Sequence, residues 1–250
     1  MNTTPERPKG LEKITETNAG KPKRELPITW VDLEILKPHE ALVQDELDAF
    51  IKSVTTSGVF YKPALVALPD YFIIDGHHRW AGLKKLGAKK IPCILLEYEN
   101  NPDINLETWY PLIKGSLQTA ISALEEERNV RLEYVKTLSA ALQSLTEKRA
   151  SFAIVDNKTK GPFILVEGDA KKILETLEKT DGIRLEFIDT QEGALKEAEA
   201  ESTAAMLRKP VTKKEVIEMV RSKRVFAPKT TRHILSFVYQ EINVKLNDLL

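Results

Sequence analysis

The chain has 250 residues, which is enough for one large domain or two small ones with buried cores. Its 37 lysines and arginines equal its 37 aspartates and glutamates, so no net charge draws it to nucleic acid or to an anionic membrane. The single cysteine, Cys93, rules out an internal disulfide and argues against a cysteine-based metal site. No apolar run approaches the roughly 20 residues that a membrane helix needs. We therefore expect a cytoplasmic protein that binds neither membranes nor nucleic acid.

The start of the chain predicts a tail followed by ordered structure. Residues 1–24 are polar, rich in Pro, Lys, Glu and Thr, and lack the apolar block of a signal peptide, which indicates a disordered segment. Order is expected from the β-rich run at residues 28–31. Residues 42–57 carry apolar side chains at three- and four-residue steps, which predicts a helix, and Gly58 suits the position after its end.

The next forty residues complete a predicted compact α/β unit of about seventy residues, which begins at residue 28. The apolar runs 63–68 and 71–74 are separated by Pro-Asp, a turn signature that predicts a β-hairpin. A helix is expected directly afterwards with Gly87 at its C-terminal end, and residues 91–98 return as a buried strand.

The remaining sequence predicts a second unit that begins near residues 110–118. Helices are expected at 117–127, 133–148, 170–180, 192–201 and, after a capping box of Thr212 and Glu215, up to residue 221. Strands are expected at 152–155, 162–166, 184–188 and 204–207, the first two as a hairpin around a turn at 157–161. The fold class is therefore α/β (α+β), with a tail (1–24), an N-terminal domain (25–115) and a second α/β domain (116–250).

The junction between a strand that ends in Asp75 and the helix that follows is the strongest functional signal. Gly76 permits a tight turn, and His77, His78 and Arg79 lie in the first helical turn. Helix N-termini expose unpaired N–H groups and the positive end of the helix dipole, so they favour phosphate. Gly76 would let a phosphate approach the backbone, and Arg79 can grip two oxygens at once. From spacing alone, a strand–turn–helix junction with surface histidines is equally compatible with this pattern.

Blocks of sequence along the chain resemble the archaeal free serine kinases, which lie within the ParB/sulfiredoxin superfamily. The Gly-x-His-Arg pattern at residues 76–79 resembles the segment of that superfamily that binds nucleotide phosphates. The blocks occur in the family's order, at 37–40 (Lys-Pro-His-Glu), 53–55 (Ser-Val-Thr), 75–86, 108–111 (Thr-Trp-Tyr-Pro) and 226–233 (Phe-Ala-Pro-Lys-Thr-Thr-Arg-His). The resemblance, less distinct at residues 117–205, implies a ParB/sulfiredoxin-like N-terminal domain with a second α/β domain packed on it to form a cleft.

The resemblance also implies an activity, namely transfer of the β-phosphoryl group of ADP to the hydroxyl of free L-serine to give O-phospho-L-serine and AMP. Carried over to this sequence, Glu40 is the general base that takes the hydroxyl proton. A serine hydroxyl is a poor nucleophile at neutral pH, and a positioned base contributes about 100- to 10,000-fold. From the residues alone, an acid that caps the following helix is the better interpretation of Glu40.

The residues of the strand–helix junction are expected to bind the nucleotide phosphates. His77, His78 and Arg79 would supply positive charge to the phosphoryl oxygens, and Asp75 and His77 join Glu40 as the expected catalytic residues. Mg²⁺ is the expected cofactor, carried on the diphosphate. Asp75 could hold this ion directly or through water, or could instead orient His78.

The end of the first helix supplies further candidates. The resemblance implies that Ser53, Thr55 and Gly58 also bind the nucleotide. Ser53 and Thr55 could equally well end the helix before Gly58, a role that needs no ligand.

Serine is a small zwitterion, so its site needs cations or N–H groups and an acceptor for the amine. The resemblance and the basic, hydroxyl-rich composition of the C-terminal block assign Thr230, Thr231, Arg232 and His233 to binding serine or its product, with Trp109 as a wall of the same pocket. Trp109 alone would be read as a core aromatic, and the basic cluster alone as a solvated surface or an RNA contact.

Other functions of this superfamily fit the sequence less well. A ParB-type nucleic-acid-binding or regulatory module would need a recognition helix and a basic stripe, and neither accompanies the phosphate motif. Sulfiredoxin chemistry needs a cysteine beside that motif, whereas Cys93 lies in a predicted strand. A nucleotide sensor would not need the base Glu40, and an ATP-dependent serine kinase remains open. A monomer is expected.

Overall fold

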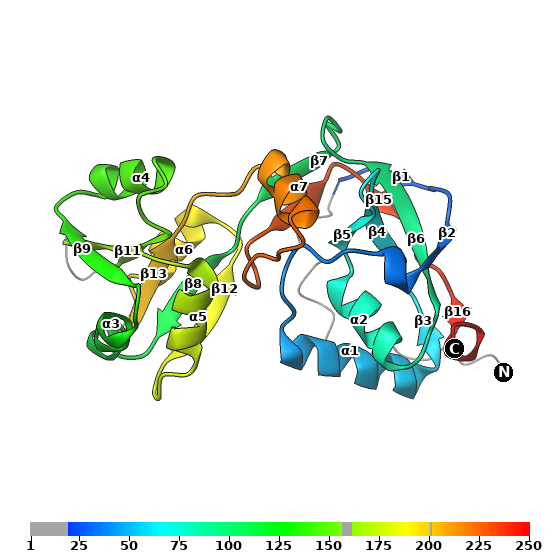
Figure 1. Ribbon diagram of the computed structural model, residues 1–250, viewed down its shortest axis with the longest axis horizontal. Helices are drawn as coiled ribbons and strands as arrows, with labels where there is room; N and C mark the ends of the chain where they lie inside the picture. Colours follow the sequence, from blue (N-terminus) through cyan, green and yellow to red (C-terminus); the bar gives the residue numbers. More distant parts are fainter. Residues whose placement is uncertain (1–19, 157–161, 201) are drawn as a thin grey trace. The chain divides into compact units, whose positions relative to one another are not determined.

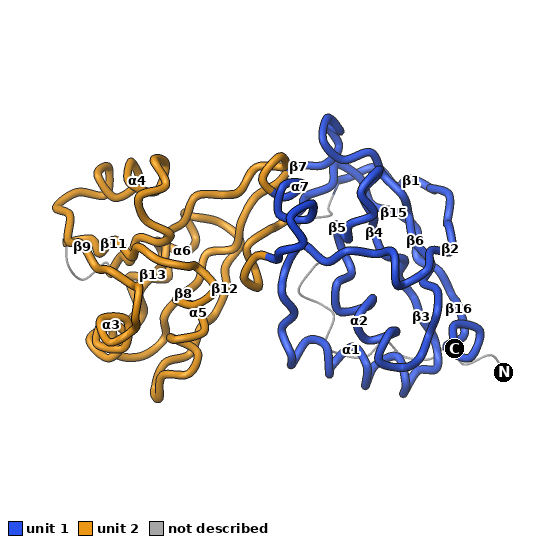
Figure 2. Tube along the Cα trace, viewed as in Figure 1, with its two compact units in different colours: residues 1–105, 216–225, 233–250 blue, residues 106–215, 226–232 orange. Residues whose placement is uncertain are grey.

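The computed structural model describes residues 20–156, 162–200 and 202–250, and the chain divides into two compact units (Figures 1 and 2). Unit 1 is formed by the chain up to residue 105, by residues 216–225 and by residues 233–250, and unit 2 by residues 106–215 and 226–232. The chain thus crosses between the units four times. The prediction of two consecutive domains that divide after residue 115 is therefore corrected.

The central sheet of unit 1 has four strands in the order β2-β6-β4-β5 (Figure 1). Its strands are β2 (Thr29–Asp32), β4 (Ala64–Leu68), β5 (Phe72–Asp75) and β6 (Lys90–Glu97). β4 and β6 run parallel, β2 pairs antiparallel with β6, and β5 pairs antiparallel with β4. The predicted hairpin is confirmed, since β4 and β5 are joined by the turn at Pro69 and Asp70.

Two helices pack against each other beside this sheet. They are α1 (Gln44–Ser57) and α2 (His77–Lys85). Gly58 ends α1 as predicted, because its φ of +68° lets its N–H reach the carbonyl of Val54. The helices approach closely at Gly82, where a Cβ would lie 2.4 Å from the ring of Phe50. The buried core beneath includes Phe60, Val66, Ile73, Leu83, Ile91 and Cys93.

Residues 233–250, the C-terminal strap, also belong to unit 1. β15 (Val238–Tyr239) pairs in parallel with β1 (Lys23–Arg24), and β16 (Val244–Lys245) pairs antiparallel with β3 (Val59–Phe60). Leu246, in the short helix η4 (Leu246–Asp248), is buried in the core of unit 1. Assignment of the strap to the second domain is therefore wrong. The predicted tail is wrong for Lys23 and Arg24, which form β1, and residues 1–19 lie outside the described residues.

Unit 2 is built on a six-stranded antiparallel sheet in the order β12-β8-β13-β10-β11-β9. Its strands are β8 (Tyr110–Lys114), β9 (Arg131–Val135), β10 (Phe152–Val155), β11 (Phe163–Glu167), β12 (Arg184–Ile188) and β13 (Thr203–Leu207). Its helices are α3 (Leu117–Glu126), α4 (Leu138–Thr146), α5 (Ala170–Glu178) and α6 (Gln191–Glu197).

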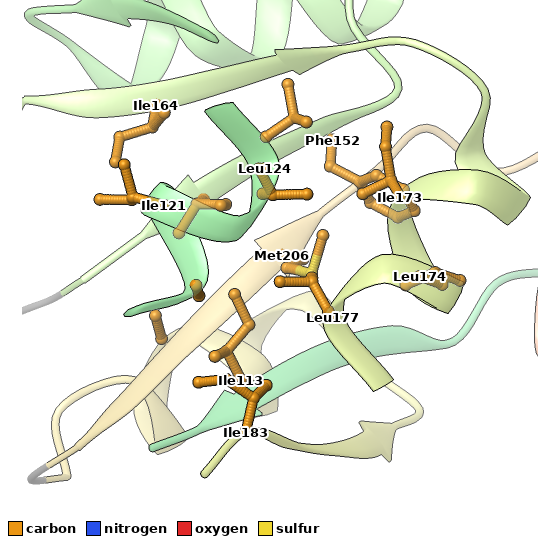
Figure 3. Packing of buried hydrophobic residues seen from close by; sticks show 14 of the residues in the cluster. Ile113, Ile121, Leu124, Phe152, Ile164, Ile173, Leu174, Leu177, Ile183 and Met206 are labelled. Carbon is orange, nitrogen blue, oxygen red and sulfur yellow. The ribbon is translucent and has the colours of Figure 1, made fainter. Parts of the chain in front are cut away.

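Both faces of this sheet are covered, which explains its continuous apolar strands. Along β10, Phe152 and Ile154 join the cluster under α3 and α5, shown in Figure 3, whereas Ala153 and Val155 join the cluster under α4 and α6. Successive strand residues point to opposite faces, so a strand buried on both faces needs an apolar residue at every position. Unit 2 is therefore a three-layer arrangement of helices, sheet and helices.

Most predicted elements of unit 2 are confirmed, with one exception. The predicted helix at 133–148 is wrong in its first part, because Glu133 and Tyr134 lie in β9 and pair with β11, and helix α4 begins only after its N-cap Thr137. The predicted turn at 157–161 lies outside the described residues. At Glu133 and Tyr134, pairing with the neighbouring strand β11 outweighed the helix propensity of the sequence.

The remaining elements are helix α7 and short strands and helices that connect the larger elements. The capping box is confirmed, since the hydroxyl of Thr212 accepts a hydrogen bond from the N–H of Glu215 at 3.2 Å just before α7 (Lys213–Arg221). The short strands β7 (Ile104–Glu107) and β14 (Arg232–Leu235) pair with each other, and a short helix, η3 (Leu33–Ile35), follows β2. Within the described ranges, no helix combines the length and apolar character needed to cross a membrane.

Candidate active site

The strand–helix junction has the form predicted from the sequence. β5 ends at Asp75, Gly76 adopts a φ of +110°, and α2 begins at His77. Gly76 is the N-cap residue and has no side chain, so it offers no acceptor to the N–H groups at the start of α2. These N–H groups and the positive end of the helix dipole create a site suited to an anion.

Arg79 folds back over this turn. A Cβ at Gly76 would lie 2.7 Å from Nη2 and 2.8 Å from Nε of Arg79, so only glycine leaves room for the guanidinium in this position. The Arg79 side chain is 13% exposed, and its Nη2 forms an ion pair with Asp75 Oδ2 at 2.8 Å. Nε is also buried, and among the described residues it has no hydrogen-bond acceptor. A buried donor of this kind is normally satisfied, which suits Arg79 to receive an anion.

Asp75 collects donors from three parts of unit 1. Its Oδ2 atom contacts Arg79, lies 3.3 Å from Nζ of Lys62, and accepts a hydrogen bond of 3.0 Å from the hydroxyl of Tyr239. Burial favours the protonated form of Asp75, but the charges of Arg79 and Lys62 outweigh it and hold the pKa of the carboxyl well below its usual range. Lys62 and Tyr239 were not predicted from the sequence.

His39 is a buried neighbour of the junction. Its side chain is fully buried, and Nδ1–H donates a 2.8 Å hydrogen bond to the carbonyl of Ile73. Burial lowers the pKa of His39 from 6.5 to about 4, although this hydrogen bond acts in the opposite direction. Its backbone N–H donates to Nε2 of His77 at 3.4 Å. His39 therefore connects the loop before α1 to the first residue of α2.

His77 was expected to supply positive charge, but its surroundings in the structure favour the uncharged imidazole. Burial lowers the pKa of His77 well below its ordinary value, and the nearby imidazoles of His39 and His233 lower it further. The ring of His39 lies 4.6 Å from the ring of His77 and 5.3 Å from that of His233. His77 is therefore neutral at pH 7 and can act through hydrogen bonds rather than through a full charge.

His78 joins the beginnings of the two helices. Its Nε2 accepts a hydrogen bond of 3.1 Å from the N–H of Val43, and its Nδ1 lies 3.3 Å from Oε2 of Glu46. Both ring nitrogens thus have partners within unit 1. Since Val43 is the N-cap of α1, His78 fixes the start of α1 against the start of α2.

His233 brings the strap to the same place. Its Nε2 lies 2.7 Å from the hydroxyl of Tyr98, just after β6. The chain has four histidines, and His39, His77 and His233 form one contiguous group of rings while His78 lies next to His77 in α2. The four histidines of the chain therefore gather near β5, the edge strand of the sheet of unit 1, although they are spread over 195 positions of sequence from 39 to 233.

Glu40 lies on the loop directly after the buried His39. The N–H of Ile73 donates to the carbonyl of Lys37 at 3.0 Å, and the N–H of Lys37 donates to the carbonyl of Tyr71, so this loop is held along β5. α1 begins only at residue 44 with Val43 as its N-cap, and Glu40 is therefore not the helix-capping acid that the sequence alone favoured. Glu40 is half-buried on a fixed loop beside the histidine group.

Ser53, Thr55 and Gly58 lie at the other end of α1 from the contact with His78. The hydroxyl of Thr55 donates to the carbonyl of Ile51 at 2.8 Å, as in many helices. Gly58 is the C-cap and leaves open space where a Cβ would be. The described contacts of Thr55 and Gly58 serve the helix, and a nucleotide contact at Ser53, Thr55 or Gly58 stays a prediction.

The predicted serine-binding residues divide between the units after Arg232. In unit 2, Arg232 forms ion pairs with Glu107 at 2.7 Å and Asp189 at 2.8 Å, and its guanidinium carbon lies 5.5 Å from the ring centre of Trp109. The ammonium of Lys229 lies 5.4 Å from the same ring. Trp109 is therefore a support for two cations and is not a core residue.

The two threonines of this block are buried. The hydroxyl of Thr230 donates to the carbonyl of Ala227 at 2.8 Å and accepts from Arg208 at 3.3 Å, while the Thr230 carbonyl accepts from the hydroxyl of Thr108 at 2.9 Å. Thr231 is 8% exposed. The described bonds of Thr230 give it a role in shaping the loop that presents Arg232.

Comparison with known proteins shows the relatives of this chain. The family model of the ParB N-terminal domain matches residues 12–108. The ADP-dependent L-serine kinase SerK of Thermococcus kodakarensis is 38% identical over 250 residues, which cover 96% of this chain and 99% of the relative. An ATP-dependent L-serine kinase of Staphylothermus marinus is 32% identical over 242 residues, which cover 91% of this chain and 95% of the relative.

Solved structures give the same result. A free serine kinase with a glutamate-to-alanine substitution, in complex with ADP, matches with a TM-score of 0.81 and 36% identity, over 92% of this chain and 97% of that chain. The sequence and structural matches both extend over nearly the full length of the chain. The chain therefore belongs to the free L-serine kinases, and its N-terminal part is a ParB-like domain.

Proposed function

We propose that this protein transfers the β-phosphoryl group of ADP to the hydroxyl of free L-serine and forms O-phospho-L-serine and AMP. The near full-length match to the ADP-dependent kinase of Thermococcus kodakarensis carries the proposal. The junction at Gly76 supports it, because a helix N-terminus with a buried arginine alongside is suited to nucleotide phosphates.

Phosphoryl transfer asks a protein mainly to position the reactants and to neutralise charge on the moving oxygens. Arg79 supplies the charge, and the N–H groups at the start of α2 supply hydrogen bonds. His77 is neutral and serves as a hydrogen-bonding partner of the phosphates or of the serine hydroxyl. His78 acts indirectly, since it fixes the start of α2 through Val43 and Glu46.

Glu40 is the proposed general base. Its loop is tied to β5 through Lys37, and its predecessor His39 is buried against the carbonyl of Ile73. A carboxylate held in this way loses little freedom when it meets the serine hydroxyl, which is the requirement for efficient proton removal.

The serine site is proposed in unit 2, at Trp109, Arg232 and the neighbouring threonines. Arg232 together with Glu107 and Asp189 offers charges of both signs. This suits a zwitterion, whose carboxylate prefers the guanidinium and whose ammonium prefers a carboxylate.

Mg²⁺ is the proposed cofactor, and it would neutralise charge on the diphosphate. Among the residues that the structure describes, no three His, Cys, Asp or Glu side chains form a group that could hold a metal. This suits an ion that stays bound to the phosphates and to water and takes at most one or two protein carboxylates. Asp75, whose side chain is 45% exposed, is the carboxylate at the phosphate site that could reach it.

The decisive experiment offers L-serine, Mg²⁺ and ADP to the purified protein and measures AMP and phosphoserine. We expect Glu40→Gln to bind ADP normally but to lower kcat by about 100-fold or more. Glu34→Gln is the control, because Glu34 is an exposed acid of unit 1 that pairs with Lys84 away from the site. A near-normal rate for Glu40→Gln excludes Glu40 as the base.

The donor needs a separate measurement, because the relatives include ADP-dependent and ATP-dependent kinases. ADP and ATP are therefore compared at equal concentration. Consumption of ATP with formation of phosphoserine, and no reaction with ADP, would overturn the donor while the kinase activity stands.

A further inference from the structure

Lys62 is a basic residue of the phosphate site that the sequence motif does not contain. It lies between β3 and β4, and the following Pro63 restricts its backbone to an extended conformation. β4 and β5 are antiparallel, with Leu65 paired to Asp75. The residues just before β4 therefore lie beside the end of β5, and Lys62 comes next to the strand–helix junction because of this pairing.

Lys62, Arg79 and Tyr239 meet at a single oxygen atom. Nζ of Lys62 lies 3.3 Å from Oδ2 of Asp75, the atom that also contacts Nη2 of Arg79 at 2.8 Å and the hydroxyl of Tyr239 at 3.0 Å. The ammonium of Lys62 also lies 5.1 Å from the ring centre of Tyr239. Tyr239 thus touches both the carboxylate and the lysine.

The charges in this group do not cancel. Two cations, Lys62 and Arg79, share one carboxylate, so the group keeps a positive charge at the start of α2. The two cations also differ in freedom, since the Lys62 side chain is 40% exposed and that of Arg79 is 13% exposed. Lysine is a point charge on a flexible stem, whereas arginine is a rigid fork, so Lys62 is the member that can move to a new anion.

Building on the proposed function, we propose that Lys62 is a further nucleotide-phosphate ligand, which exchanges Oδ2 of Asp75 for a phosphate oxygen when the nucleotide binds. Asp75 and Tyr239 are then positioning residues, because they hold the ammonium beside the helix N-terminus. A diphosphate carries more negative charge than a single carboxylate, so it competes successfully for the lysine. Burial keeps the phenol of Tyr239 protonated, since its pKa is raised well above the ordinary value.

Equilibrium binding of ADP and of adenosine to the full-length protein, measured by calorimetry without serine, tests this proposal. Lys62→Gln should weaken ADP binding by about 10- to 100-fold, the usual effect of losing one charge-assisted contact. Adenosine has no phosphate, so its affinity should stay the same. Lys62→Arg should recover most of the ADP affinity.

Lys84→Gln is a matched control. Lys84 is also a lysine of unit 1, paired with a carboxylate at 3.0 Å and lying 5.7 Å from the ring centre of Trp80, but it is in the last turn of α2. We expect no change of ADP affinity in this variant. An ADP affinity of Lys62→Gln within twofold of the wild type, or an equal loss for ADP and adenosine, would overturn the proposal.

The positioning role has its own readout. Tyr239→Phe should weaken ADP binding in the wild-type background and have a smaller effect when Lys62 is already glutamine, since the part of its effect that acts through the lysine is then lost. Equal effects in both backgrounds would contradict this role. Failure of the proposed function is distinguishable, because it appears as absence of phosphoserine with wild-type protein while the Lys62 effect on ADP binding persists.

Discussion

The hydroxyl of Tyr98 lies 2.7 Å from Nε2 of His233, a residue 135 positions further along the chain. Burial raises the pKa of Tyr98 well above its ordinary value, so the phenol stays protonated at neutral pH. The Tyr98 ring also packs edge-on against Phe72, with ring centres 4.7 Å apart. Tyr98 thereby fixes the orientation of the histidine that the strap brings to the site.

Tyr98→Phe tests this orientation. Phenylalanine keeps the packing on Phe72 but removes the partner of His233, so we expect the free energy of unfolding to fall by about 1 kcal/mol. A histidine that can rotate is less well placed, and kcat/KM for L-serine should fall about tenfold. Tyr134→Phe, at an exposed position of β9, is the control for loss of a phenol. Unchanged kinetics in Tyr98→Phe would mean that His233 needs no such support.

Gly76→Ala and Gly87→Ala separate backbone strain from the position of Arg79. Both glycines have positive φ, +110° and +91°, so either alanine should lower the free energy of unfolding by about 1–2 kcal/mol. Only at Gly76 would the new Cβ meet Arg79, since Gly87 has nothing within 4 Å. We therefore expect ADP affinity to fall in Gly76→Ala alone. An equal loss of affinity in both variants would point to strain rather than to Arg79.

Gly82→Ala should reverse the usual effect of this substitution. An alanine normally stabilises a helix interior by about 1 kcal/mol relative to glycine. Here its Cβ would lie 2.4 Å from Phe50, so α1 and α2 must separate, and we expect a loss of about 1–3 kcal/mol in urea unfolding. Adding Phe50→Leu should recover part of this loss, and a stabilised single variant would contradict the close helix contact.

His39 should make stability depend on pH. Its pKa is lowered from 6.5 to about 4, so between these values the unfolded chain binds a proton that the native protein does not. The free energy of unfolding therefore rises with pH across this window, and the contribution is complete above pH 6.5 at roughly 3 kcal/mol. His39→Asn can keep the donor to Ile73 without titrating. Its unfolding free energy should fall less steeply than that of the wild type from pH 7 to 4, and parallel curves would exclude this role.

Features that depend on residues close together in the sequence could be predicted from it. Gly58 ends α1 because glycine adopts the left-handed φ that this position requires. Thr212 caps α7, and its partner Glu215 lies only three residues later. The junction from Asp75 to Arg79 also depends on neighbours in sequence, so it could be recognised without the fold.

Contacts between residues far apart in the sequence could not be predicted, for physical reasons. Tyr239 meets Asp75 across 164 positions, and no local pattern tells which sheet a two-residue strand such as β15 will join. The neutrality of His77 depends on burial and on other histidines, which spacing does not reveal. Lys62 is different, because its place just before β4 follows from the predicted hairpin and could have been inferred.

The strap has a consequence for how activity arises during synthesis. Domains fold largely during synthesis. Unit 1 cannot be completed until residues 233–250 have been made, and these follow all its other residues in the chain. A chain that stops before residue 233 contains Asp75 and Lys62 but neither His233 nor Tyr239. On the proposed roles of His233 and Tyr239, a molecule that is unfinished or clipped before residue 233 is expected to lack kinase activity although its motif is intact.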